Sequence, residues 1–408
     1  MLILDQHPSG RHFLQIPGPS PVPDRILRAM SLPTIDHRGP EFATLGLKLI
    51  AGLKQVFRTQ HPVAIYPASG TGAWEAALVN VLSAGDGVLM VETGHFATLW
   101  QKMAQRLGLK PEFLALPGTC EETGLPLAWR HGVRADLVAE RLRADRSHQI
   151  RAVCVVHNET STGATSDIAA VRRAIDDAMH PALLMVDTIA SLGSIPFNID
   201  DLGVDVAVGG SQKGLMTPPG LAFTAANAKA KQAHKTAGLK TSYWDWTFRD
   251  GKEHYMWYAG TPPVQMVFAL RKALDLILAE GLDNIFHRHA ILGGATRAAA
   301  EVWCSKGKMA FAVSEPKERS NSVTCLLTPE GAGPAIMDYC EKNLGVTIGR
   351  GIGPLTGKAI RIAHMGHVNG WGHLGTIAAV ETALKALGIE HGAGGVQAAT
   401  DYIARHVK

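Results

Sequence analysis

Five short apolar runs, separated by helix-patterned segments, limit the folds that this chain can adopt. Each run is continuously apolar, as a strand is when helices cover both faces of its sheet. Strands that alternate with helices along the chain indicate βαβ units and a mostly parallel sheet. We therefore predict an α/β fold. The five runs cover residues 63–66, 88–91, 152–156, 182–186 and 204–208.

The segments around these runs carry helical periodicity. Residues 72–86 and 166–179 are each expected to form a helix, and the second opens on a Ser-Asp capping pair. A further helix is expected over 42–57, where apolar residues recur at helical spacing. Asp24 is expected to cap the short helix that follows it, "RILRAM".

The length of 408 residues suggests about two domains. Residues 1–24 include "IPGPSPVPD", whose four prolines exclude a helix interior, and we expect an extended N-terminal arm there. The alternation of strands and helices predicts a large domain over 25–283. From 284 to 408 a long helical segment is followed by shorter, mixed segments. We expect a smaller α+β domain in that region.

Composition excludes several kinds of protein. Forty Lys and Arg against 36 Asp and Glu give a net charge of +4, too small to indicate a nucleic-acid or membrane partner. The five cysteines form no CxxC pair, which argues against a disulfide framework or a cysteine zinc site. No apolar run approaches about 18 residues, and the N-terminus lacks the pattern of a secretory signal. We therefore expect a cytoplasmic protein.

Polar residues follow the apolar runs where each predicted strand ends. Ser69-Gly70-Thr71 follows the first run and opens a helix, whose N-terminal N–H groups can bind a phosphate. Thr160 and Asp187 follow the third and fourth runs, and Lys213 lies on the glycine-rich turn "GGSQKG" after the fifth. Because ligands gather beyond the carboxyl ends of parallel strands, we expect these residues at one edge of the sheet.

A phosphate-binding loop, a carboxylate and a lysine at one edge together indicate pyridoxal 5′-phosphate. Lys213 would form a Schiff base with the aldehyde of this cofactor. Asp187 would pair with the pyridine nitrogen and keep it protonated, so that the ring can accept electrons. Ser69, Gly70 and Thr71 would hold the 5′-phosphate.

Other ligand motifs fail on spacing. "GIGPLTGK" is similar to a Walker A loop, but Ile352 stands where the first glycine is needed. "SGTGAWE" lacks the third glycine of a dinucleotide fingerprint. HExxH is absent, and His364, His367 and His373 have no clear carboxylate companion. We therefore expect no metal site.

At these residues the sequence resembles the class V, fold-type I pyridoxal-phosphate aminotransferases, most of all the alanine–glyoxylate and serine–glyoxylate aminotransferase family. The motifs that carry the resemblance include "PASGTGAWEAALVN", "VVHNETSTG", "LLMVDTIASLGS", "GSQKGLMTPPGLA" and "GPLTGKAIRIAHMG", and it spans nearly the whole chain. The resemblance implies a large domain with a mostly parallel, seven-stranded sheet between helices, and a smaller α+β C-terminal domain.

The resemblance also implies roles for residues near the cofactor. Gln212 would contact the phenolic oxygen, and Thr160 would contact the side of the ring. Phe96, in "TGHFATLW", takes the place of a ring-stacking tryptophan or phenylalanine; it can stack but has no indole N–H to donate. Arg361 would bind the substrate α-carboxylate, for which its planar fork is well suited.

Four further residues would act across a subunit boundary. Tyr258 and Thr261, in "YAGTPP", match a pair that reaches the phosphate of the neighbouring subunit. The segment His37-Arg38 matches one that enters the partner's site and helps to recognise the substrate side chain. The resemblance thus implies a homodimer with two shared active sites, possibly assembled further into a tetramer.

The reaction implied is the transfer of an amino group from a small L-amino acid to glyoxylate. Serine is the favoured donor, giving hydroxypyruvate and glycine, and "IDHRGPEF" is closer to the serine or aspartate type than to the alanine type. Aspartate or alanine as donor, and pyruvate as acceptor, stay open. A cysteine desulfurase is a rival on the same fold, but there a histidine usually precedes the lysine, and here Gln212 does. A non-catalytic binding protein is the rival from a different class.

Overall fold

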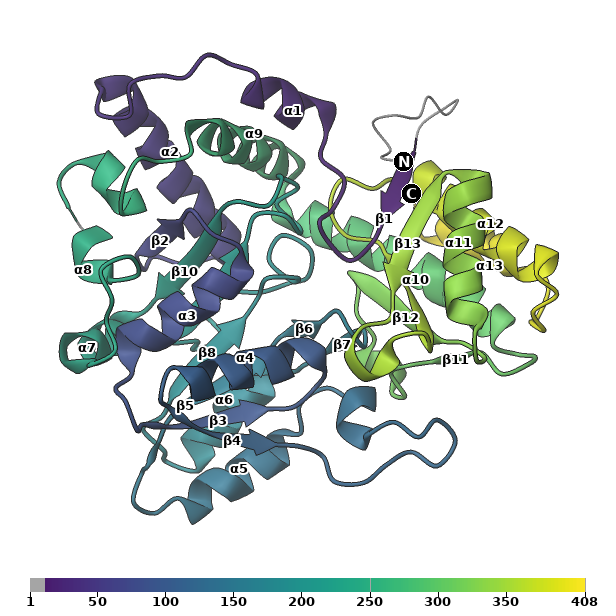
Figure 1. Ribbon diagram of the computed structural model, residues 1–408, viewed down its shortest axis with the longest axis horizontal. Helices are drawn as coiled ribbons and strands as arrows, with labels where there is room; N and C mark the ends of the chain where they lie inside the picture. Colours follow the sequence, from purple (N-terminus) through teal and green to yellow (C-terminus); the bar gives the residue numbers. More distant parts are fainter. Residues whose placement is uncertain (1–11, 250, 408) are drawn as a thin grey trace.

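The computed structural model describes residues 12–249 and 251–407, which fold into two lobes, each built around a sheet (Figure 1). The larger lobe holds a seven-stranded sheet and the smaller lobe a five-stranded one. A two-stranded ribbon, β6 (Asn158–Glu159) and β7 (Ala164–Thr165), completes the sheets. The predicted α/β fold is confirmed.

The seven-stranded sheet is parallel except for β10, which runs antiparallel to both of its neighbours. All five apolar runs form strands of this sheet. The other two strands, β4 and β10, carry weaker patterns, since β4 ("KPEFL") is a part-exposed edge strand and β10 ("AFTAA") has few large apolar residues. In spatial order the strands are β2 (Val63–Tyr66), β10 (Ala222–Ala226), β9 (Val206–Gly210), β8 (Leu183–Asp187), β5 (Ile150–Val156), β3 (Gly87–Val91) and β4 (Lys110–Leu114).

Helices cover both faces of this sheet, so alternate strand residues enter two separate cores. In β5, Val153 and Val155 face one core, and Ala152 and Cys154 face the other. The first core is closed by α2 (Pro40–Phe57), α5 (Ala135–Ala144), α6 (Ile168–Asp177) and α9 (Val264–Glu280), and the second by α3 (Gly70–Val81), α4 (His95–Arg106) and α7 (Ala228–Thr236). No helix in the described part of the chain is both long and apolar enough to cross a membrane.

Helix boundaries differ from the predictions in two places. The helix expected over 72–86 begins at Gly70 and ends at Val81, because Asp86 accepts a hydrogen bond from the main chain of Ser83 and closes a turn there. Asp24 is the first residue of α1 (Asp24–Met30) and not its cap, a position that Pro23 takes. The cap expected for α6 is present, since Asp167 accepts from the amide of Ala170.

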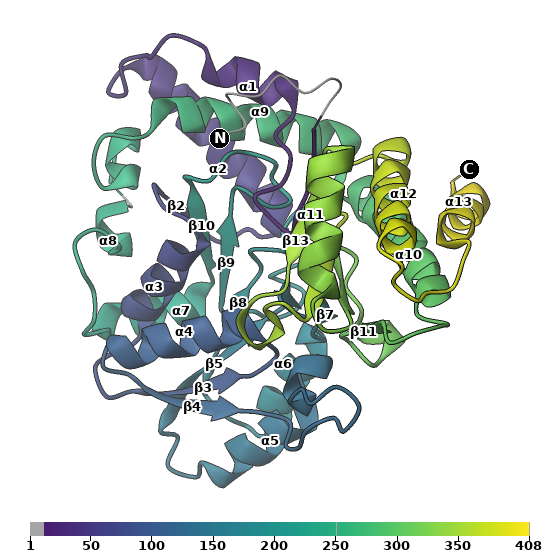
Figure 2. The ribbon, with the colours of Figure 1, turned by 45° about the vertical axis from the view of Figure 1, so that its right-hand side comes forward.

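The small sheet includes a strand from the N-terminal arm. Strand β1 (Phe13–Gln15) pairs in parallel with β13 (Val346–Arg350), and the order continues through β14 (Ala359–Ala363), β12 (Val323–Leu327) and β11 (Ala310–Phe311). The expected arm over 1–24 therefore contributes a strand to the C-terminal lobe, and its residues 1–11 lie outside the described residues. Three helices pack on this sheet (Figure 2): α10 (Leu282–Trp303), α11 (Ala332–Leu344) and α12 (Gly370–Ala386). A further helix, α13 (Gly395–His406), packs on α10 and α12. The expected boundary at residue 284 falls just inside α10.

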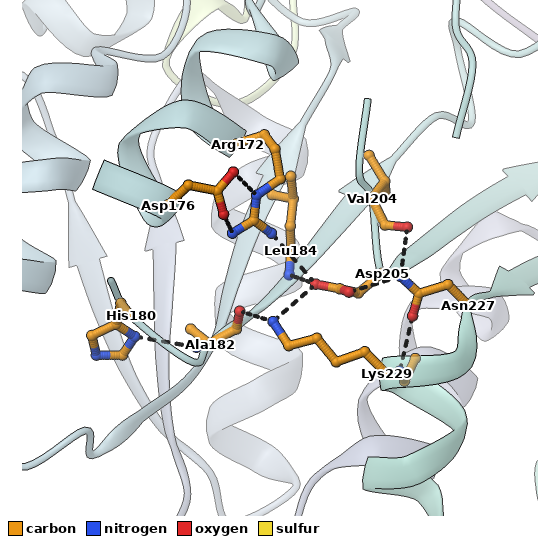
Figure 3. Close-up of polar contacts among 10 residues, drawn as sticks. Arg172, Asp176, His180, Ala182, Leu184, Val204, Asp205, Asn227 and Lys229 are labelled. Atoms are coloured by element: carbon orange, nitrogen blue, oxygen red, sulfur yellow. Dashed lines mark hydrogen bonds and ion pairs between the residues drawn. The ribbon is translucent and has the colours of Figure 1, made fainter. Parts of the chain in front are cut away.

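A buried carboxylate organises the amino ends of the central strands. Asp205 is 3% exposed and accepts hydrogen bonds from the amide of Leu184 at 2.7 Å and from Nδ2 of Asn227 at 2.8 Å (Figure 3). The side chains of Arg172 and Lys229 approach it at 3.7 and 3.6 Å. These contacts connect β8, β9 and the start of α7 at the edge of the sheet opposite to the predicted site.

Candidate active site

A pocket of about 130 Å³ lies at the carboxyl ends of the large-sheet strands. β8 ends on Asp187, and the turn after β9 carries Gln212 and Lys213. The start of α3 forms another wall. Phe96 and the segment after β5 supply the rest, so the pocket gathers residues from five separate parts of the chain. The predicted residues that line it are Ser69, Gly70, Thr71, Phe96, Thr160, Asp187, Gln212 and Lys213.

Lys213 is held by the N-terminal arm. Its Nζ donates a hydrogen bond to the carbonyl of Pro17 at 2.5 Å, and the hydroxyl of Ser20 donates to the carbonyl of Lys213 at 2.7 Å. Burial and the positive charge of Arg361 lower the pKa of Lys213 to about 8. Much of this amine is therefore neutral near that pH, as a base or nucleophile must be.

Asp187 is buried, and both of its oxygens accept hydrogen bonds. Oδ2 accepts from the indole N–H of Trp74 at 2.9 Å, and Oδ1 accepts from the amide of Ile189 at 2.7 Å. Burial raises the pKa of Asp187 to about 7, and these two hydrogen bonds act against the rise. The carboxylate is thus fixed in orientation, and the two hydrogen bonds offset only part of the cost of burying its negative charge. A cation placed beside it would therefore be bound strongly.

Arg361 comes from the small sheet and approaches the pocket from that side. Its Nε donates to the carbonyl of Arg350 at 2.7 Å, and its Nη1 donates to the carbonyl of Thr160 at 3.0 Å. Because Thr160 lines the pocket, these bonds place the guanidinium next to it. An anionic substrate in the pocket would meet the positive guanidinium of Arg361.

This geometry can now be compared with known proteins. Residues 34–361 match the family model described as "Aminotransferase class-V". The chain belongs to the class V aminotransferases. This aminotransferase is 42% identical over 402 residues to the serine–glyoxylate aminotransferase of Methylorubrum extorquens, across 97% of this chain and 96% of that protein. It is 41% identical to the L-aspartate–glyoxylate aminotransferase of Paracoccus denitrificans, across 95% of both chains.

Solved structures agree with the fold of this aminotransferase. The ureidoglycine–glyoxylate aminotransferase of Bacillus subtilis superposes with a TM-score of 0.85 at 26% identity, covering 98% of this chain and 100% of that one. The resemblance to the class V, fold-type I family is therefore confirmed. The individual site residues stay predictions that rest on the pocket geometry.

Sequence reasoning did not single out Trp74, which lines the pocket, or Glu159, which lies behind it. Trp74 lies one helical turn after the loop at the start of α3, and its ring stacks on Trp100 with centroids 6.0 Å apart. Glu159 is fully buried behind the pocket and accepts hydrogen bonds from α4 and from Ser161. Glu159 lies within the motif "VVHNETSTG", so its position next to the predicted contact Thr160 was the available signal.

The four residues expected to act across a subunit boundary lie away from this pocket. Tyr258 is buried, burial raises its pKa, and its hydroxyl has no hydrogen-bond partner among the described residues, whereas Thr261 is exposed. Near them, His37 meets the ring of Tyr255 edge-on, and Arg38 lies 4.8 Å from the centre of that ring. One chain alone does not bring these residues to its own Lys213.

Proposed function

We propose that this aminotransferase binds pyridoxal 5′-phosphate and transfers the amino group of a small L-amino acid to glyoxylate, with serine as the favoured donor. The observation that carries the proposal is the meeting of Lys213 and Asp187 in one pocket beside the N-terminus of α3. The names of two relatives above 40% identity contain glyoxylate, one with serine and one with aspartate as donor. Aspartate is therefore the second candidate donor.

The pocket residues fit this cofactor. The N-cap residue of α3, Ser69, makes no side-chain capping bond, so the first N–H groups of a 12-residue helix are available to a phosphate. Oε1 of Gln212 is buried without a partner among residues 12–249 and 251–407, as expected of a group that meets a ligand. Asp187 offers a buried carboxylate to a protonated ring nitrogen.

The residues of the chain have separate tasks in the proposed reaction. When bound, pyridoxal phosphate supplies an aldehyde that condenses with amines and a ring that accepts electrons. The amine of Lys213, whose pKa is lowered to about 8, can take the proton from the substrate Cα and return it. Asp187 stabilises positive charge at the ring nitrogen, and a positive charge there in turn favours the ionised carboxylate.

Arg361 is suited to bind the α-carboxylate that amino and keto substrates share. Its hydrogen bonds to the carbonyls of Arg350 and Thr160 fix the plane of the guanidinium. Nη2 makes no hydrogen bond within the described parts of the chain and can donate to a substrate. Both halves of the reaction would therefore use the same arginine.

A cysteine desulfurase needs a reactive cysteine as its nucleophile, and the two cysteines considered for that role are poorly suited to it. Cys325 and Cys340 are both buried, and burial raises the pKa of each thiol to about 12. Almost none of either thiol is ionised at neutral pH, and thiolate is the nucleophilic form. The pKa of the Cys120 thiol is lowered by a hydrogen bond with Thr123, but Cys120 is not among the residues that line the pocket.

A homodimer would complete the site. The hydroxyl of Tyr258 has no hydrogen-bond partner in the part of the chain that the structure describes, and large apolar side chains on the same side of the molecule are exposed. They lie on α2, on α8 (Trp246–Arg249) and on η3 (His254–Tyr258). Burying them against a second copy removes apolar surface from water and would bring Tyr258 and Thr261 to the partner's phosphate. The exposed side chains are Leu47 at 57%, Phe248 at 55% and Met256 at 40%.

A matrix of donors and acceptors tests the proposal. Serine, aspartate and alanine are each combined with glyoxylate, pyruvate and 2-oxoglutarate, and the amino and keto products are measured. We expect the highest kcat/KM for serine with glyoxylate, and no turnover by Lys213→Ala. Turnover by Lys213→Ala, or a protein that binds no pyridoxal phosphate, would overturn the proposal. A higher kcat/KM with aspartate than with serine would make aspartate the favoured donor and leave the proposed chemistry unchanged.

A further inference from the structure

Helix α4 begins without a side-chain cap of its own. Its N-cap residue is Gly94, which has no side chain to accept a hydrogen bond. The first three amides of the helix instead donate to residues more than 60 positions later in the chain. Oγ of Ser161 accepts from His95 at 3.0 Å, and Oε2 of Glu159 accepts from Phe96 at 3.0 Å and Ala97 at 3.2 Å. The cap is thus supplied by the segment after β5.

Gly94 is what allows this approach. Its φ of 154° lies in a region that favours glycine, and a Cβ there would lie 2.5 Å from Oγ of Ser161 and 2.6 Å from Cγ of Glu159. Any side chain at this position would therefore push the carboxylate away from the helix.

The carboxylate of Glu159 accepts hydrogen bonds at both of its oxygens. Oε1 accepts from the amide of Ser161 at 3.0 Å and from its hydroxyl at 2.6 Å, so each oxygen takes two donors. The N-terminus of a 12-residue helix adds a favourable dipole. Burial raises the pKa of Glu159, and these four hydrogen bonds oppose the rise without cancelling it.

Glu159 stands between two walls of the pocket. On one side it fixes the amide of Phe96, whose ring lines the pocket and lies 6.3 Å from the ring of Trp74. On the other side it is bonded along the chain to Thr160, whose carbonyl accepts from Arg361. A shift of this carboxylate would move both walls.

We propose that Glu159 is a positioning residue that holds Phe96 and Thr160 in fixed relation across the pocket. Its charge has a second consequence that does not depend on the proposed function. Lys213 is influenced by Arg361, which lowers its pKa, and by Asp187 and Glu159, which raise it. Without the negative charge of Glu159, less remains to offset the lowering effect of Arg361 on the pKa of Lys213. That pKa should then fall below about 8.

The test uses Glu159→Gln in the full chain. Glutamine keeps the shape but presents an NH₂ group to amides that also donate, so one side of the cap is lost. The matched control is Asp205→Asn, which removes a buried carboxylate from the opposite edge of the sheet (Figure 3). Both variants are expected to lower the urea midpoint of unfolding. If Glu159→Gln fails to fold, Ser161→Ala, which removes the hydroxyl donor to Glu159 and keeps its charge, is measured in its place for the cofactor Kd.

Two readouts separate positioning from a general loss of stability. First, the Kd for pyridoxal phosphate, followed by quenching of tryptophan fluorescence, is expected to rise about fivefold or more in Glu159→Gln and to stay within about twofold in Asp205→Asn. Second, the pH midpoint for acetylation of Lys213 in cofactor-free protein, followed by mass spectrometry, is expected to move to lower pH in Glu159→Gln only.

The cofactor readout rests on the proposed function, and the acetylation readout does not. Wild-type protein that fails to bind pyridoxal phosphate would overturn the proposed function and leave the acetylation test standing. If the wild-type protein binds pyridoxal phosphate but Glu159→Gln gives the same result as Asp205→Asn in both readouts, only the positioning role is overturned.

Discussion

The hydrogen bond from Trp74 to Asp187 allows a sharp test of how the pocket is built. Trp74→Phe removes the indole N–H that donates to Oδ2 of Asp187 at 2.9 Å and keeps an aromatic ring against Trp100. Hydrogen bonds to buried charged groups contribute about 1.5–3 kcal/mol. Losing this one destabilises the ionised carboxylate, so the pKa of Asp187 rises further above about 7.

The proposed cofactor needs that carboxylate in its ionised form and in a fixed plane. A loss of about 1.5 kcal/mol corresponds to an increase of about tenfold in the Kd for pyridoxal phosphate. The sign also gives a pH dependence. The loss of affinity relative to wild type should be largest at the acid end of the range, below the wild-type pKa of about 7, and should shrink toward pH 9, where both carboxylates are ionised. Fluorescence or absorbance titrations from pH 6 to 9 measure both effects.

Trp100→Phe is the matched control. Trp100 is buried beside Trp74, but its indole N–H has no partner in the described structure, so the substitution removes the same atoms without a hydrogen bond to Asp187. We expect its Kd to stay close to wild type. Equal affinities of the two variants would refute the reasoning, because ring volume and not the hydrogen bond would then decide cofactor binding.

Three further predictions follow from the same contacts. Arg361→Ala should raise KM for amino and keto substrates together, by about 30-fold or more, because a buried charged partner of the shared carboxylate is lost; steady-state kinetics with both substrates would contradict this if only one KM changed. Gly18→Ala should weaken binding of pyridoxal phosphate about tenfold or more, because a Cβ at φ 92° would overlap Nζ of Lys213, whereas the control Gly388→Ala, with φ 64° and open space around it, should bind normally. The rate at which cofactor-free protein captures pyridoxal phosphate should rise with pH through about 8 and then level, because the neutral amine reacts and the pKa of Lys213 is lowered from 10.5 to about 8. Stopped-flow rates that rise only near pH 10.5 would contradict a lowered pKa for Lys213.

The edge at which Asp187 and Lys213 meet could be predicted because it follows from strand direction. Each residue comes at or just after the end of a continuously apolar run, and parallel strands end at one edge. Strands β4 and β10 were harder to predict: "KPEFL" mixes a lysine and a proline into an edge strand, and "AFTAA" carries mostly alanine. Strand β1 has three residues and pairs with a strand more than 300 positions later, which no local pattern indicates.

The supporting residues could not be predicted because their partners are set by tertiary packing. Trp74 donates to a carboxylate 113 positions away, and Glu159 caps a helix that begins more than 60 positions before it. Both contacts depend on how α3 and α4 lie across the ends of β5 and β8. The proposed roles of Tyr258 and His37 depend on a second copy of the chain, so neither one sequence nor one chain displays them.

The most direct test of the account is chemical identification of the lysine that binds the cofactor. Protein loaded with pyridoxal phosphate is reduced with borohydride, digested and analysed by mass spectrometry. The account predicts a phosphopyridoxyl group on Lys213, in the peptide that contains "GGSQKGLM", and none in Lys213→Ala. Stoichiometric modification of a different lysine, such as Lys358, or none in the wild type, would contradict it.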